Sequence, residues 1–168
     1  MEKRKLRLMT LSAMISAIVC IATMVIHIPA VKGYINAGDC IVNLSGWILP
    51  PAYSAIASGI GSMFADILSG YPVYAPATLI IKSAMGLVSA LIFLKLRKKH
   101  STILSCTVAS AVSEVIMVAG YTAYEIVLYH SLATALTGVF GNVLQSAMGI
   151  IGSVAVYKVL STRKTAVQ

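Results

Sequence analysis

Long apolar segments, separated by short polar or proline-containing stretches, make up nearly the whole chain. A helix needs about 20 mostly apolar residues to cross roughly 30 Å of hydrocarbon. The pattern therefore predicts an all-α integral membrane protein, with a single domain over residues 1–168 that forms a bundle of six transmembrane helices. The predicted helices cover residues 8–28, 37–49, 51–68, 77–95, 103–126 and 132–160.

The helix predicted over residues 37–49 is the shortest of the six. Pro50 and Pro51 separate it from the next helix, because proline lacks a backbone donor and disfavours helical angles in the preceding residue. Two alternatives stay open. The helix begins earlier, near Lys32, or it spans incompletely beside a cavity, where protein or water covers the irregular backbone.

Two stretches rich in tyrosine interrupt the apolar pattern. Gly70–Pro76 combines glycine, proline and tyrosine, and Tyr121–His130 contains three tyrosines. Such residues punctuate helices and suit a membrane–water interface. We expect both stretches to be loops on one side of the membrane, together with residues 29–36.

Basic residues gather at three places along the chain. They lie at residues 3–7, at residues 95–99, and at Lys158, Arg163 and Lys164. A net charge of +8 would suggest nucleic-acid binding in a soluble protein. Because 58% of the residues in this sequence are hydrophobic, the charge instead indicates which ends of the helices face the cytoplasm. Lysine and arginine favour the cytoplasmic side, which predicts that both termini are cytoplasmic and that no nucleic acid is bound.

The first apolar segment, which follows basic residues, resembles a signal peptide in outline. Its length, and the lack of a small-residue cleavage site before Pro29, favour a retained helix. The cysteines Cys20, Cys40 and Cys106 are scattered through apolar segments without metal-ligand spacing, so we predict that they are packing residues.

Polar residues inside the predicted spans are the main functional candidates. Each costs several kcal/mol unless it is paired or faces water. Most lie in the external halves of their helices, where their convergence would make a polar pocket among aromatic rings. One alternative is structural: Asp66 and Lys82 neutralise each other and the amides join helices. The candidate substrate-binding residues are Asn36, Asp39, Asn43, Lys82, Glu114, Tyr121, Asn142 and Gln145.

Ala13 and Ala17 stand four residues apart on the first predicted helix. Small residues at this spacing allow helices to approach closely. Two interpretations stay open: packing inside this bundle, or docking of another membrane subunit.

Several function classes find no support in the sequence. It has no HExxH, GxSxG or Walker motif, and His27, His100 and His130 are isolated. We therefore predict no enzyme activity, no catalytic residue, no metal and no cofactor. No repeated selectivity filter or internal repeat is evident, which leaves a binding subunit or a small carrier.

Four segments carry a resemblance to a known family. They are Gly33–Asp39 (GYINAGD), Gly59–Asp66 (GIGSMFAD), Ala75–Lys82 (APATLIIK) and Gly141–Gln145 (GNVLQ). These segments resemble the substrate-binding S component of energy-coupling factor (ECF) vitamin transporters. Within that superfamily the chain is most similar to the branch assigned to pyridoxine (vitamin B6) or the hydroxymethylpyrimidine moiety of thiamine.

The resemblance implies a high-affinity vitamin-binding subunit in the plasma membrane of a prokaryote, without a cofactor. Such a subunit captures its vitamin outside and docks on a transmembrane coupling protein driven by two ATPase subunits. It also implies that Ala13 and Ala17 meet the coupling protein and that loops after helices 1, 3 and 5 form a lid. The lid or supporting residues are then Tyr34, Asp66, Tyr71, Tyr74, Tyr124 and Glu125.

The expected roles in that site follow from side-chain chemistry. Asp39 or Glu114 accepts hydrogen bonds from the ligand, Lys82 donates one, and the amides of Asn142 and Gln145 set its orientation. Asp66 alternatively holds Lys82 in place. The runner-up function is a stand-alone membrane carrier or assembly protein that needs no ATPase.

Overall fold

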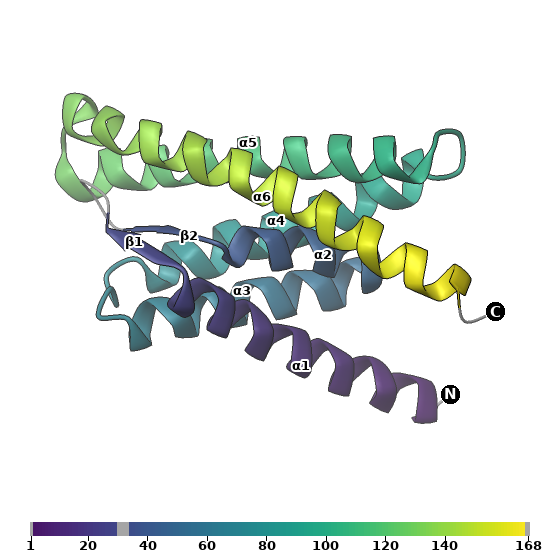
Figure 1. The fold of residues 1–168 in the computed structure, drawn as a ribbon. Coiled ribbons are helices and arrows are strands. Elements are labelled where there is room, and N and C mark those ends of the chain that lie inside the picture. Colours follow the sequence, from purple (N-terminus) through teal and green to yellow (C-terminus); the bar gives the residue numbers. More distant parts are fainter. Residues whose placement is uncertain (1, 30–33, 167–168) are drawn as a thin grey trace.

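The computed structural model describes residues 2–29 and 34–166, and over these ranges it contains six helices and one short β-hairpin (Figure 1). Lys32 and Gly33 lie outside the described residues, as do the side chains of His27, Arg163 and Lys164. The elements are α1 (Glu2–Val25), β1 (His27–Pro29), β2 (Tyr34–Asn36), α2 (Gly38–Ile48), α3 (Pro51–Leu68), α4 (Ala75–Leu96), α5 (Thr102–Tyr129) and α6 (Leu132–Ala166).

The helices run side by side and give the bundle two distinct ends (Figure 1). The two termini and the turn between α4 and α5 lie at one end, which we call the terminal end. The hairpin and the turns that follow α3 and α5 lie at the other, the hairpin end. Helix α3 packs against α1 and α4, and α5 packs against α4 and α6. The three predicted basic clusters thus belong to one end of the molecule.

Within residues 2–29 and 34–166, four helices, α1, α4, α5 and α6, are long and apolar enough to cross a bilayer. Helix α2 has 11 residues, a rise of about 16 Å, so it does not span by itself. Its start near Lys32 is wrong, because Tyr34–Asn36 forms a strand and the helix begins at Gly38. The alternative of an incomplete span describes α2, whose residues are mostly buried between α4 and α6.

The hairpin end differs from the sequence prediction in two ways. The loop expected over Tyr121–His130 is wrong, because α5 continues to Tyr129 and the chain turns at His130, whose φ is 50°. No proline or glycine follows Gly120 before that turn, so interfacial tyrosines do not end the helix. The residues before α2 form an antiparallel pair of three-residue strands, too short for a pattern to reveal.

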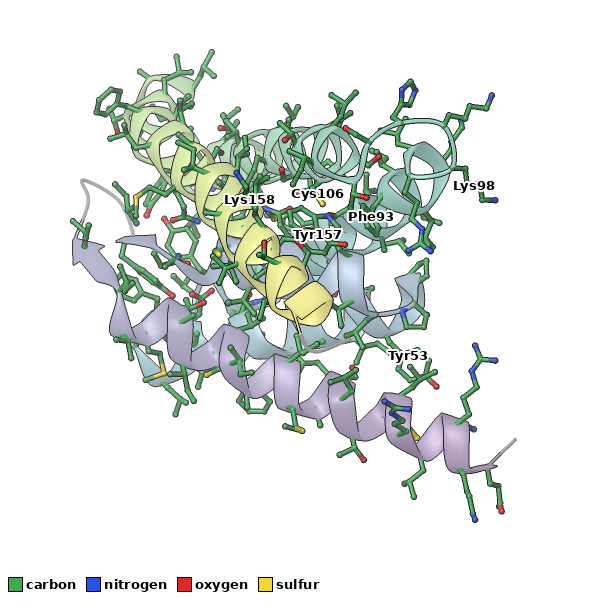
Figure 2. The ribbon with its side chains drawn as sticks, turned by 45° about the vertical axis from the view of Figure 1, so that its right-hand side comes forward. Tyr53, Phe93, Lys98, Cys106, Tyr157 and Lys158 are labelled. Atoms are coloured by element: carbon green, nitrogen blue, oxygen red, sulfur yellow. The ribbon has the colours of Figure 1, made fainter. Side chains whose placement is uncertain are left out.

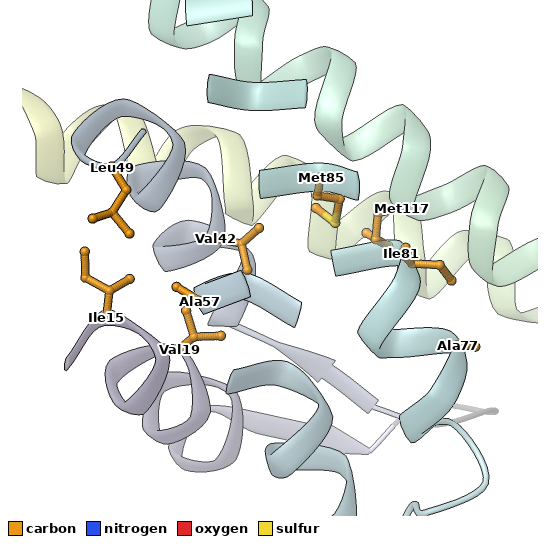
Figure 3. Packing of buried hydrophobic residues seen from close by; sticks show 9 residues of the cluster. All are labelled: Ile15, Val19, Val42, Leu49, Ala57, Ala77, Ile81, Met85 and Met117. Atoms are coloured by element: carbon orange, nitrogen blue, oxygen red, sulfur yellow. The ribbon is translucent and has the colours of Figure 1, made fainter. Parts of the chain in front are cut away.

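The apolar core joins five helices (Figure 3). Val19 of α1, Val42 of α2 and Ala57 of α3 meet on one side, and Met85 of α4 and Met117 of α5 extend the cluster. Close approach of α2 and α4 depends on a missing side chain: a Cβ at Gly46 would lie 2.9 Å from Cβ of Ser89. The core is therefore fixed by small residues as much as by large ones.

Serine hydroxyls bind the three central helices together. Ser45 on α2 lies 2.7 Å from Ser54 and 2.9 Å from Ser58 on α3. Ser54 in turn donates to the carbonyl of Gly86 on α4 at 3.0 Å. Such bonds stabilise helix contacts where no water is available.

A second cluster fills the terminal end (Figure 2). Trp47 contacts Phe93 and Tyr157, with ring centroids 6.1 and 5.5 Å away. Cys106 is buried in the same cluster, where it acts as a packing residue. Lys98 points outward from the turn between α4 and α5. The polar interior of the bundle is therefore closed by aromatic rings toward the terminal end.

Candidate ligand-binding site

A polar cavity lies at the hairpin end of the bundle. Its volume is about 50 Å³, and the empty space reaches about 420 Å³ when its open mouth is included. Strand β2, the turn before α4, and helices α3, α4, α5 and α6 all contribute to it. The lining residues are Tyr34, Asn36, Asp66, Tyr71, Tyr74, Thr78, Tyr121, Glu125, Asn142 and Gln145.

Gln145 and its partners form the floor of the cavity. Its Oε1 accepts hydrogen bonds from the backbone N and the Nδ2 of Asn36, at 3.0 and 3.2 Å. Its Nε2 donates to Asp39 Oδ2 at 2.6 Å. Lys82 Nζ forms an ion pair with the other oxygen of Asp39. These four side chains are buried, and their hydrogen bonds and ion pair join the hairpin, α2, α4 and α6 in one polar network.

A second polar layer lies beneath this floor. Asn43 on α2 donates to Glu114 Oε1 on α5 at 2.8 Å and accepts a hydrogen bond from Ser113. Both Asn43 and Glu114 are buried, and neither lines the cavity. Helix α6 comes close here, because a Cβ at Gly149 would lie 3.0 Å from the Cβ of Asp39. This layer lies outside the cavity lining and packs against the floor.

One wall of the cavity ties the hairpin to α3. Tyr34 OH donates to Asp66 Oδ1 at 2.6 Å, and its ring lies 5.0 Å from that of Tyr71. Burial raises the pKa of Tyr34, and the carboxylate of Asp66 raises it further. The phenol therefore stays protonated and donates its hydrogen bond throughout the physiological pH range.

The opposite wall is built from α5 and the start of α4. Tyr74 OH lies 3.4 Å from Glu125 Oε1 and 3.0 Å from the hydroxyl of Tyr129. Tyr124 packs edge-on against Tyr74, with centroids 5.6 Å apart, and donates to the carbonyl of Val73. Tyrosine rings thus surround the mouth of the cavity, while carboxylates lie behind them.

Thr78 is a lining residue that the sequence did not single out. Its hydroxyl lies 2.9 Å from that of Tyr121, and the ring of Tyr121 lies 5.5 Å from Lys82 Nζ. The available signal was its position four residues before Lys82, one turn away on the same face of α4. A threonine in an apolar helix is too common for that spacing to single it out.

The structure brings most of the predicted site residues together. Asn36, Tyr121, Asn142 and Gln145 line the cavity, Asp39 and Lys82 lie in its floor, and Asn43 and Glu114 lie one layer deeper. Of the predicted lid or supporting residues, Tyr34, Asp66, Tyr71, Tyr74 and Glu125 also line it, and Tyr124 packs behind Tyr74.

Two details of the prediction are wrong. Lys82 pairs with Asp39, and Asp66 accepts a hydrogen bond from Tyr34, so Asp66 and Lys82 do not neutralise each other as an ion pair. The spacing of residues 36, 39 and 43 also predicts one shared helical face, but Asn36 lies on β2 and is not part of the helix that carries Asp39 and Asn43. The turn at Ala37 nevertheless brings Asn36 to the same network, because its Oδ1 accepts from the backbone N of Gly38.

A separate apolar groove of about 570 Å³ lies between α1 and α3. Helix α1 turns Ser12, Ile15 and Val19 inward, whereas Ala13 and Ala17 are exposed and line the groove. The opposite wall contains Ile56, Ile60, Phe64 and Leu68, all of which are exposed. The small residues of α1 therefore face an open apolar surface.

Apolar helices around a polar cavity that opens at one end define a membrane-embedded binding protein for a small solute. Residues 3–162 match the family described as "ECF-type riboflavin transporter, S component". The chain belongs to this family of S components, the substrate-binding subunits of ECF transporters.

Two further comparisons extend this result. The chain is 34% identical over 135 residues to an uncharacterized protein in the gap 3′ region of Pyrococcus woesei. The aligned residues cover 79% of this chain and 87% of that protein. The fold is similar to the S component of a bacterial ECF transporter, with a TM-score of 0.70 at 18% identity over 96% of this chain and 98% of that one. The predicted S-component family is confirmed. The finer assignment to a pyridoxine or hydroxymethylpyrimidine branch stays a prediction.

Proposed function

We propose that this S component captures a single-ring vitamin of the pyridoxine or hydroxymethylpyrimidine type from outside the cell. The observation that carries the proposal is the cavity at the hairpin end, in which helices far apart in sequence present amides, hydroxyls and aromatic rings to one small space. Binding requires no chemical step, because such a pocket acts by shape and hydrogen bonding.

The size of the cavity favours a single ring. With its open mouth the cavity reaches about 420 Å³, near the lower end of the range of about 300–1,000 Å³ for ligand pockets, which favours a substituted pyridine or pyrimidine over three fused rings with a ribityl chain. Riboflavin, which appears in the description of the matching family, has the latter structure. It is the second candidate ligand, and that description is the observation in its favour.

The polar groups suggest how such a ring would be held. The amides of Asn142 and Gln145 set its orientation, and tyrosine faces such as those of Tyr71 and Tyr121 stack on it. Asp39 and Lys82 act through Gln145, since both oxygens of Asp39 are already engaged. We therefore assign them the role of positioning the floor, and Asn43 and Glu114 the role of supporting it.

The charge distribution supports an orientation in the membrane. Lys3, Arg7 and Lys158 lie toward the terminal end, as does the turn that contains Lys98. Basic residues favour the cytoplasm, so we place both termini inside and the mouth of the cavity outside, in the plasma membrane of a prokaryote.

The groove between α1 and α3 is our proposed docking surface for the transmembrane coupling protein, which two ATPase subunits drive. Exposed Ala13 and Ala17 allow a partner helix to approach closely, and Ile60 and Phe64 provide apolar area.

Uptake in cells tests the whole proposal. Cells that lack their own route for the labelled vitamin would express this chain with or without a coupling protein and ATPases. We expect ATP-dependent accumulation with the complete module and surface binding without accumulation when the module is absent. Accumulation by the chain alone would support the stand-alone carrier and contradict the proposed ATP-driven subunit.

A further inference from the structure

We propose that the ligand binds as a cation, with its positive charge beside Asp66. This inference rests on the proposed function and narrows its ligand to a single-ring vitamin that carries an ammonium group on a ring substituent.

The acidic residues are concentrated around the cavity. The sequence has five, and all except Glu2 are buried in the bundle: Asp39, Asp66, Glu114 and Glu125. Among the 13 lysines and arginines, Lys82 is the buried one within the described residues. A chain with a net charge of +8 thus gathers nearly all its carboxyl groups inside the bundle, and two of them, Asp66 and Glu125, line the cavity.

The single buried lysine has its ion-pair partner in the floor of the cavity. Lys82 pairs there with Asp39. Asp66 and Glu125 line the cavity, and no lysine, arginine or histidine among the described residues lines it with them. The lining therefore offers carboxylates and hydroxyls to a ligand, which favours a positively charged partner and disfavours an anionic one.

Asp66 has an oxygen that is available to such a partner. The residue is 6% exposed, and its Oδ1 accepts the hydrogen bond from Tyr34. Its Oδ2 is buried, and among the described residues no group donates a hydrogen bond to it; the hydroxyl of Thr78 lies nearby and pairs with Tyr121. A buried carboxylate oxygen without a donor is costly, and a charged donor relieves that cost more than a neutral one.

The aromatic walls suit the same kind of ligand. Tyr34 and Tyr71 form a tilted ring pair beside Asp66, and Tyr74 lines the cavity from the start of α4. The face of an aromatic ring carries negative charge and attracts a cation within about 6 Å. A flat ring with a positive substituent can therefore stack on a tyrosine while its charge reaches Asp66.

A matched pair of ligands tests this inference on the unmodified protein. Pyridoxamine and pyridoxine share one ring and differ by an ammonium in place of a hydroxyl. Calorimetric titration of the full chain in detergent at pH 7 would compare the two, and hydroxymethylpyrimidine with its aminomethyl counterpart, in which an ammonium replaces the hydroxyl, would form a second pair. We expect the cationic member of a bound pair to bind at least about tenfold more tightly.

Variants at Asp66 then locate the effect. Asp66→Asn removes the charge and should bring the preference within each pair to about threefold or less, whereas Asp66→Glu should retain it. Equal or tighter binding of the neutral members to the unmodified protein would overturn the cationic ligand while leaving a single-ring vitamin in place. Failure of all four compounds to bind folded protein would overturn the proposed function, and this inference with it.

Discussion

Gln145 on α6 donates a hydrogen bond of 2.6 Å to Asp39 on α2, although the two residues are 106 positions apart in the sequence. The same amide accepts two hydrogen bonds from Asn36 on the hairpin. One side chain thus links the hairpin, the short central helix and the last helix. The floor of the cavity depends on this link because Asp39 is fully buried, and its Oδ2 would lose its donor without Gln145.

Replacing Gln145 by leucine should separate these three elements. The substitution keeps a side chain of similar size but leaves Asp39 Oδ2 and the donors of Asn36 unpaired, at a cost of about 1–3 kcal/mol. We expect vitamin affinity to fall by at least about tenfold and the unfolding temperature to drop. Titration calorimetry and thermal unfolding in detergent measure the two effects.

Leu144→Ala is the matched control, since Leu144 is the neighbouring residue on α6 and is exposed on the outer surface. It should leave vitamin affinity within about twofold of the unmodified protein. Equal losses in the two variants would mean that Gln145 acts only through the general packing of α6.

The ion pair between Lys82 and Asp39 should show a large coupling energy, so that loss of one partner costs more stability than loss of both. Lys82→Met leaves a buried carboxylate without its cation and should destabilise the bundle by about 3–5 kcal/mol. The double variant Asp39→Asn with Lys82→Met removes both charges and should recover a large part of that loss. Denaturant unfolding of the four proteins in a double-mutant cycle measures the coupling energy. Additive losses would contradict a direct pair.

Helix α6 packs closely against α2 and α5 at Gly149. An added Cβ there would lie 3.0 Å from the Cβ of Asp39, an atom that cannot move aside without shifting α2. We therefore expect Gly149→Ala to destabilise the protein by about 1–3 kcal/mol and to weaken vitamin binding.

The control for this helix is Gly152→Ala, one turn further along α6. Its added Cβ would lie 3.4 Å from Cys40 Sγ, an ordinary contact, so stability should change by less than about 0.5 kcal/mol. Thermal unfolding of the two variants compares them directly. A greater effect at Gly152 would contradict the close packing described at Gly149.

The docking surface on α1 can be blocked without touching the cavity. Ala17→Trp fills the groove with a large ring and should reduce capture of the coupling protein and ATPases by at least about fivefold in a pull-down. Ile18→Trp places the same ring at an exposed position next to it, outside the groove, and should not. Vitamin affinity should be unchanged in both. Undiminished capture by the Ala17 variant would exclude this face.

The sequence predicted the helical bundle and most of the cavity because burial inside a membrane makes polar residues conspicuous. Asp39, Lys82 and Gln145 were found because a polar side chain in an apolar segment costs free energy unless it is paired or faces water. The sequence did not show which of them pair with each other, since an ion pair between α2 and α4 depends on how the two helices are rotated about their axes. The hairpin and the continuation of α5 to Tyr129 were missed because short strands and interfacial tyrosines leave no periodic signal. Thr78 was missed because a threonine is common in apolar helices and does not stand out as a candidate.

Native mass spectrometry of the purified chain in detergent tests the central claim most directly. The protein would be challenged with pyridoxine, pyridoxamine, thiamine, hydroxymethylpyrimidine, riboflavin, pantothenate and folate in one competition. The account predicts a one-to-one adduct with a single-ring pyridine or pyrimidine vitamin at submicromolar concentration, on the order of 10⁻⁷ M, and its loss in Gln145→Leu. An adduct with riboflavin alone, or no adduct in protein shown to be folded, would contradict it.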